Sequence, residues 1–151
     1  ESPINWQLQH LERLDILQAD VAPLMASLVN TDFPLNSVGV LPVEYLSADE
    51  HSKAKQLVAN MRQILEQFLT KSNHKELRTF LFKPYEPLAH HKLSQHLQLI
   101  DELLQAERFK DVQRHAKQLI NQALAGLHYF QTYDRPMLMS IIICGYLGWI
   151  G

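Results

Sequence analysis

The helical character of this chain is decided by the stretch AKQLVANMRQILEQFL, residues 54–69. Its apolar residues recur at intervals of three and four, which is the period of one face of an α-helix. The members of this stripe are Ala54, Leu57, Val58, Met61, Leu65, Phe68 and Leu69. The pattern predicts a long amphipathic helix over residues 47–71, which Ser47 and Glu50 are expected to begin as a capping box.

A connector over residues 72–87 is expected to follow this helix. Ser72 and Asn73 are poor helix formers, and we expect them to break the helix. Pro84 and Pro87 then forbid a regular helix in the second half of the connector.

Residues 88–131 predict two helices that form one αα-hairpin with a tight turn at residues 105–109. The first helix has an apolar stripe of Leu93, Leu97, Ile100 and Leu104, and the second has one of Val112, Ala116, Leu119, Ile120, Ala123, Leu124 and Leu127. Gly126 is either a weak point of the second helix or a site of close packing. We expect the second helix to run nearly unbroken toward the C-terminal apolar residues.

The segment before the long helix predicts a shorter one over residues 20–29, with Asp20 as its cap and Pro23 in its first turn. Its apolar stripe is Val21, Leu24, Met25 and Leu28. Asn30 is expected to end this helix in the left-handed conformation. Residues 33–42 are rich in turn formers and predict a loop.

The C-terminal stretch PMLMSIIICGYLGWIG, residues 136–151, contains no charged residue. A membrane-spanning helix takes about 20 apolar residues, and this run reaches the last residue of the sequence. We therefore expect it to be the start of a transmembrane helix, truncated at Gly151. The alternative is a buried helix of a soluble core, although such helices are rarely apolar on all sides.

Composition limits the other classes of function. The formal net charge is −2, so no basic footprint points to nucleic acid. A single cysteine, Cys144, cannot form an internal disulfide. The sequence starts at Glu1 without a Met or a signal peptide, which favours an internal fragment.

Three histidines close together, His90, His91 and His96, raise the question of a metal site. Two ligands on a helix usually stand three or four residues apart, whereas His91 and His96 are five apart. No nearby group of His, Cys, Asp or Glu completes a ligand set. We therefore expect solvated surface histidines and assign no metal ligand.

The candidates for catalysis are equally weak. Asp15 and Asp20 are five residues apart, but Asp20 is already explained as a helix cap. Ser27, Ser37 and Ser47 lack the strained turn or neighbouring base that activates a serine. Gly39 stands alone and forms no phosphate-binding loop. No catalytic and no cofactor-binding residue is assigned.

Asp134 and Arg135 stand directly before the apolar run. Two interpretations remain open: a polar stop at the water boundary, in which these residues form ion pairs, or a contact of Arg135 with a lipid head group. Met137 and Met139 are expected to face lipid or to pack against a neighbouring helix.

Two parts of the sequence resemble a known family. They are LDILQADVAPLM at residues 14–25 with FPLNSVGVLP at residues 33–42, and YFQTYDR at residues 129–135 before the apolar run. These blocks are similar to the GPI ethanolamine phosphate transferases, a family with an α/β alkaline-phosphatase-like catalytic domain. The resemblance extends over nearly the whole chain.

The resemblance implies a parent enzyme that transfers phosphoethanolamine from phosphatidylethanolamine to the first mannose of a GPI precursor. It implies an endoplasmic reticulum membrane protein with a luminal soluble part, a two-metal zinc site and a Thr nucleophile. Those ligands would lie upstream of Glu1, so no functional residue is carried over to this chain.

The combined expectation is a mainly α chain in three parts. Residues 1–46 are the helix-loop end of the catalytic domain, residues 47–135 a helical spacer, and residues 136–151 the start of a transmembrane helix. This fragment would be catalytically inert and would link the catalytic domain to the lipid bilayer and the membrane bundle. The alternative is a helical module that binds a partner protein.

Overall fold

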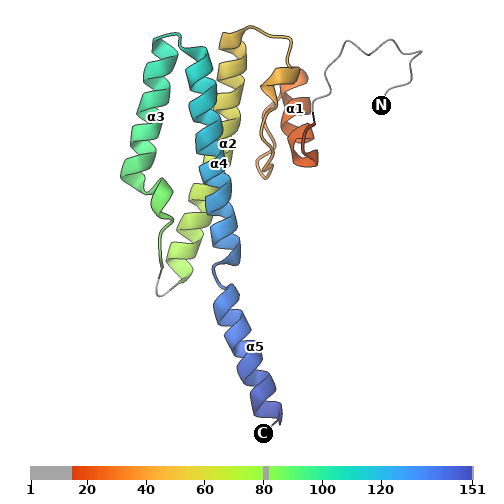
Figure 1. Cartoon of the computed structure of the whole chain (residues 1–151), viewed down its shortest axis with the longest axis vertical. Coiled ribbons are helices and arrows are strands. Elements are labelled where there is room, and N and C mark those ends of the chain that lie inside the picture. Colours follow the sequence, from red (N-terminus) through yellow and green to blue (C-terminus); the bar gives the residue numbers. More distant parts are fainter. Residues whose placement is uncertain (1–14, 80–81, 151) are drawn as a thin grey trace, which may run out of the picture.

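The longest helix of the structure is α2, Glu50–Arg78, which carries the apolar stripe that defines the fold. The computed structural model describes residues 15–79 and 82–150, and within these ranges it contains helices and no strand (Figure 1). The prediction of a mainly α fold is therefore confirmed. Helix α2 packs chiefly against α4, Phe109–Thr132, which lies beside it.

The start of α2 differs from the prediction. The cap is Asp49, whose carboxylate accepts hydrogen bonds from the backbone N–H of Ser52 at 3.0 Å and from its hydroxyl at 2.6 Å. These hydrogen bonds from Ser52 hold the pKa of Asp49 below its usual value. The predicted capping box of Ser47 and Glu50 is wrong, because an Asp closer to the helix already satisfies the first free N–H groups.

The end of α2 also differs from the prediction, since the helix continues through Ser72 and Asn73 to Arg78. A poor helix former costs only about 0.5 kcal/mol in an α-helix, so tertiary contacts can outweigh two of them. One such contact is the ion pair between Lys75, in the last turns of α2, and Asp134.

The αα-hairpin is confirmed. A single turn of 3₁₀-helix, η4, Glu86–Leu88, leads into α3, His90–Gln105, and a three-residue turn joins α3 to α4 (Figure 1). In this turn Glu107 has a φ of 56°. The N–H of Arg108 donates to the Leu103 carbonyl at 3.0 Å, and the N–H of Glu107 donates to the Leu104 carbonyl at 3.1 Å. This is the Schellman pattern, which satisfies the free carbonyls at the end of α3.

The short helix α1, Val21–Leu28, follows a 3₁₀ turn, η2, Gln18–Asp20. It ends as the sequence predicts, because Asn30 takes a φ of 53° and the N–H of Thr31 donates to the Ala26 carbonyl at 3.0 Å. Asn tolerates the left-handed region better than most residues, so this ending is inexpensive.

The face that α1 buries is not the predicted one. Pro23 and Ala26 are buried, and Leu24 packs partly against the core. The remaining members of the predicted stripe are exposed: Val21 by 43%, Met25 by 54% and Leu28 by 60%. Pro23 and Ala26 thus face the protein core, and the larger apolar side chains face away from it.

The loop after α1 joins the same core as the long helices. Leu41 and Leu46 are buried with the short 3₁₀ turn η3, Val43–Tyr45, between them. Asn60, fully buried on α2, holds this loop, because it accepts from the N–H of Leu41 at 2.9 Å and donates to the Gly39 carbonyl at 3.2 Å. The predicted division of the chain at residue 46 stays a prediction.

The apolar C-terminal residues form a separate helix, α5, Arg135–Ile150, which projects from one end of the bundle (Figure 1). A two-residue turn, Tyr133 and Asp134, separates it from α4. Helix α5 contributes no residue to the core. Among the described residues, no helix is both long enough and apolar enough to cross a bilayer.

We predict that Asn60→Ala lowers the free energy of unfolding by about 2 kcal/mol, because it leaves the N–H of Leu41 and the Gly39 carbonyl without their buried partner. Urea denaturation followed by circular dichroism measures this change. The matched control is Gln67→Ala: it removes a donor to the Ser37 carbonyl, which keeps a second donor in Gln63, so the loss should stay below about 1 kcal/mol. Equal losses in the two variants would contradict the role of Asn60.

Candidate functional site at the base of the apolar helix

The junction between α4 and α5 is surrounded by aromatic side chains. They come from α2, from the connector after it, from the last turn of α4 and from the turn that follows α4, and they are Phe68, Phe82, Tyr85, Tyr129, Phe130 and Tyr133. Phe130 is fully buried, and its ring centroid lies 5.7 Å from that of Phe68 and 5.9 Å from that of Phe82. Rings at these separations stabilise one another beyond their buried area. Helix α5 therefore begins next to a well-packed cluster of aromatic side chains.

Two tyrosines hold the connector to α4. Tyr129 and Tyr133 are four residues apart, so both project from one face of the chain, with ring centroids 5.6 Å apart. The N–H of Lys83 donates to the Tyr133 hydroxyl at 2.8 Å, and the Tyr129 hydroxyl donates to the Lys83 carbonyl at 3.2 Å. Burial raises the pKa of Tyr129, and the neighbouring Tyr133 adds to this. The Tyr129 hydroxyl thus remains a neutral donor at physiological pH.

An ion pair joins the end of α2 to the turn before α5. Lys75 pairs with Asp134, and its ammonium group lies 5.7 Å from the centroid of the Tyr133 ring. The Lys75 side chain is 18% exposed and that of Asp134 is 44% exposed, so water screens the pair only in part. The Asp134 carbonyl also accepts the N–H of Leu138 at 3.0 Å, in the first turn of α5. One residue therefore connects α2 with the start of α5.

Close packing at Gly126 brings these elements together. A Cβ atom on this residue would lie 2.5 Å from Cε2 of Phe68 and 3.0 Å from Cδ1 of Tyr85. A side chain at this position would displace the buried ring of Phe68, so the prediction of close packing at Gly126 is confirmed.

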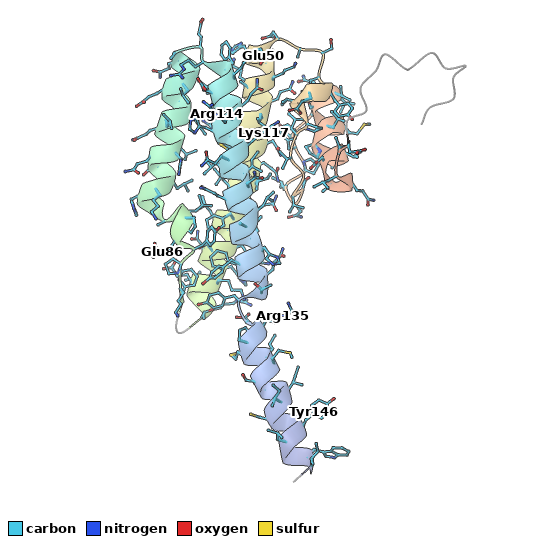
Figure 2. The ribbon with its side chains drawn as sticks, viewed as in Figure 1. Glu50, Glu86, Arg114, Lys117, Arg135 and Tyr146 are labelled. Atoms are coloured by element: carbon cyan, nitrogen blue, oxygen red, sulfur yellow. The ribbon has the colours of Figure 1, made fainter. Side chains whose placement is uncertain are left out.

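The sequence predicted only part of this site. Asp134 was expected at a polar boundary, and the structure gives it an ion pair with Lys75. Arg135, labelled in Figure 2, is exposed at the first position of α5. The roles of Lys75 and Lys83 were not predicted, because their partners are distant in the sequence. The spacing of Tyr129 and Tyr133 was a signal that could have identified the two tyrosines.

Among the described side chains, the histidines of α3 join no group of possible metal ligands. His91 is exposed, His96 is half-buried, and the side chain of His90 lies outside what the structure describes. In the described ranges no group of three or more His, Cys, Asp or Glu side chains is arranged to hold a metal ion.

The structural role of Asp20 differs from the predicted one. It occupies the position before α1, but its carboxylate makes no cap hydrogen bond to that helix. It accepts instead from the N–H of Val40 at 2.8 Å and from that of Leu17 at 3.3 Å. Asp20 thereby holds the loop after α1 against the start of that helix. Asp15 and Asp20 both line an open surface cavity of about 550 Å³.

The serine and glycine candidates have structural roles. The Ser27 hydroxyl donates to the Gln56 side chain, and the Ser37 hydroxyl accepts from the N–H of Gly39 at 3.3 Å. A Cβ atom on Gly39 would overlap the carbonyl oxygen of Ala19. Gly39 is therefore required for close approach of two backbone segments.

The chain is similar to several known proteins. The family model described as phosphatidylinositolglycan class N (PIG-N) matches residues 125–151, which include the α4–α5 junction and α5. GPI ethanolamine phosphate transferase 1 from Homo sapiens is 44% identical over 147 residues, which cover 96% of this chain and 16% of the human protein. The protein of the same name from Neurospora crassa is 41% identical, over 99% of this chain and 15% of its own length.

The protein of this name from Mus musculus is 42% identical, over 96% of this chain and 16% of its own length. The chain thus spans about one sixth of the length of these curated relatives. The resemblance noted in the sequence is confirmed over nearly the whole chain. No solved structure matches the chain significantly.

We predict that Lys75 and Asp134 stabilise the junction together by about 0.5 to 1 kcal/mol, because both charges are partly shielded from water. A double-mutant cycle with Lys75→Met and Asp134→Asn, measured by urea denaturation, gives this coupling energy. The matched cycle uses Arg62→Met and Asp101→Asn, whose charged atoms lie 3.6 Å apart with both side chains more than half exposed. Its coupling should be close to zero, and a larger coupling there than at the junction would contradict the prediction.

Proposed function

We propose that this chain, which is related to one part of GPI ethanolamine phosphate transferase 1, joins the catalytic domain of such an enzyme to the membrane. The parent enzyme would transfer phosphoethanolamine from phosphatidylethanolamine to the first mannose of a GPI precursor. It would work in the endoplasmic reticulum membrane with its soluble part in the lumen. The catalytic site, with its zinc ions, would lie outside this chain.

The observation that carries the proposal is that every residue of α5 is exposed. Its large apolar side chains are between 51% and 85% exposed, and they are Met137, Leu138, Met139, Ile141, Ile142, Ile143, Tyr146, Leu147, Trp149 and Ile150. Complete transfer of such a side chain from water to an apolar phase gains about 2 kcal/mol, so together, at these exposures, they favour an apolar environment by roughly 10 kcal/mol. A helix also satisfies its own backbone hydrogen bonds, as the interior of a bilayer requires. We infer that α5 enters the bilayer.

A second exposed apolar surface supports the link to a catalytic domain. It is formed by Leu17, Val21, Met25, Leu28 and Val29 on and around α1, which are between 43% and 72% exposed. Helix α1 lies beside the bundle near the end opposite α5 (Figure 1). A contiguous exposed apolar surface usually marks a contact with another protein surface. We infer that the catalytic domain covers it.

The bundle between these two surfaces would set the height of the catalytic domain above the bilayer. The 29 residues of α2 extend over about 43 Å, and α4 packs along them. The alternative of a partner-binding helical module has less support, because the apolar residues Leu93, Ile100 and Leu103 of α3 are buried in the core. The hairpin therefore keeps little apolar surface for a partner.

We predict that the purified chain, kept in detergent, is catalytically inert. It should bind no stoichiometric zinc, measured by metal analysis, and release no phosphoethanolamine from phosphatidylethanolamine, because no described group of its side chains is arranged to hold a metal. The full-length parent enzyme assayed in the same detergent is the positive control. Turnover by the chain alone, or tightly bound zinc in a one-to-one ratio, would contradict the proposal.

We also predict that Met25→Lys in the full-length parent enzyme lowers transferase activity at least tenfold, because it places a charge in the proposed contact with the catalytic domain. The readout is activity per amount of membrane-inserted enzyme. The control is Gln98→Lys, which adds the same charge at an exposed position of α3. Unchanged activity in the Met25 variant would show that the catalytic domain does not cover α1.

A further inference from the structure

We propose that Arg78, Lys83 and Arg135 form a cationic collar around the base of α5 that binds the phosphates of anionic lipid head groups. This proposal deepens the proposed function and depends on α5 entering the bilayer. It concerns a lipid surface, which is separate from the substrates and the catalytic site of the parent enzyme.

The three cations come from three segments that meet at the junction. Lys75 pairs with Asp134, so the end of α2 is level with the start of α5. Arg78 is three residues beyond Lys75 and therefore lies about 4.5 Å farther along α2, in its last turn. The backbone of Lys83 is held by the Tyr133 hydroxyl, and Arg135 is the first residue of α5. The base of α5 in Figure 2 carries the Arg135 label.

The collar residues are exposed, and none of them is in an ion pair among the described residues. Most other described cations are neutralised by a carboxylate: Lys53, Arg62, Lys75, Lys92, Arg108, Arg114 and Lys117. The pairing of Lys75 with Asp134 matters most, because it occupies the carboxylate next to Arg135. Glu76 is two residues before Arg78 and so projects from another side of α2.

The positive charge at this end of the bundle is not a property of the whole chain, whose formal net charge is −2. Among the described residues, the remaining unpaired cations are Lys71, one turn before Lys75 on α2, and Lys55 and Lys110 near the other end of the bundle. Unpaired positive charge is therefore concentrated where the exposed apolar helix begins. An apolar helix with a cationic base matches a bilayer, whose apolar interior is bordered by phosphates.

Lys and Arg have long apolar stems, so their charged ends can reach the head groups while the bundle stays above them. Each cation near an anionic bilayer surface strengthens binding about fivefold at moderate salt. The guanidinium groups of Arg78 and Arg135 can also bind a phosphate through two hydrogen bonds. Because the collar residues come from three segments, their binding to lipid phosphates would fix the orientation of the bundle relative to the bilayer and would also strengthen its attachment.

The test is flotation of the full 151-residue chain with lipid vesicles, either phosphatidylcholine alone or an equimolar mixture of phosphatidylcholine and phosphatidylserine. The test variant is Arg78→Gln with Lys83→Gln, which leaves α5 unchanged. The matched control is Lys55→Gln with Lys110→Gln, which removes the same charge from the opposite end of the bundle. Circular dichroism of each variant confirms that the helices are retained.

We expect the native chain and the control to prefer the anionic vesicles, and the test variant to lose about 25-fold of that preference. High salt should remove the difference, since it screens exposed charges. Equal preference in test and control variants, or no preference in the native chain, would overturn the collar. Binding of the native chain to phosphatidylcholine vesicles tests α5 separately: no binding there would contradict the proposed membrane entry, whereas binding there without a preference for anionic vesicles would contradict the collar alone.

Discussion

Gly126 allows α4 to approach α2 so closely that Phe68 lies against the glycine backbone, and the rest of the structure depends on this contact. The two helices pack along their apolar stripes, and fully buried side chains such as Met61, Ile64 and Ile120 occupy the space between them. The loop after α1 is then held on α2 by Asn60, and α3 folds back onto α4 through the turn at Glu107.

The same packing determines where α5 begins. It brings Lys75 of α2 to Asp134, and it brings the connector to Tyr129 and Tyr133. The chain therefore leaves the bundle at a point fixed by an ion pair, two hydroxyl groups and an aromatic cluster. A helix with such a fixed starting point is consistent with the proposed link between a catalytic domain and a bilayer.

The exposed apolar surfaces of α5 and α1 differ in how their apolar residues are distributed around the helix, and this difference favours different partners. Helix α5 is apolar on all sides, as expected of a helix surrounded by lipid. Helix α1 buries its small residues and exposes Val21, Met25 and Leu28 on one face, as expected of a helix between two protein surfaces. Among the described residues, the cations without an ion pair are concentrated beside α5.

The sequence alone determined that the chain is mainly helical, that two helices form a hairpin, that Asn30 is left-handed and that residues 136–150 are apolar and without charge. These features are local, because helical periodicity and turn preferences depend on residues within a few positions of one another. The tertiary structure decided the rest: the extension of α2 to Arg78, the outward direction of the α1 stripe and the partner of Asp134. Lys75 and Asp134 are 59 residues apart, so no local pattern relates them. Periodicity shows which residues share a face of a helix, but it does not show which other element packs against that face.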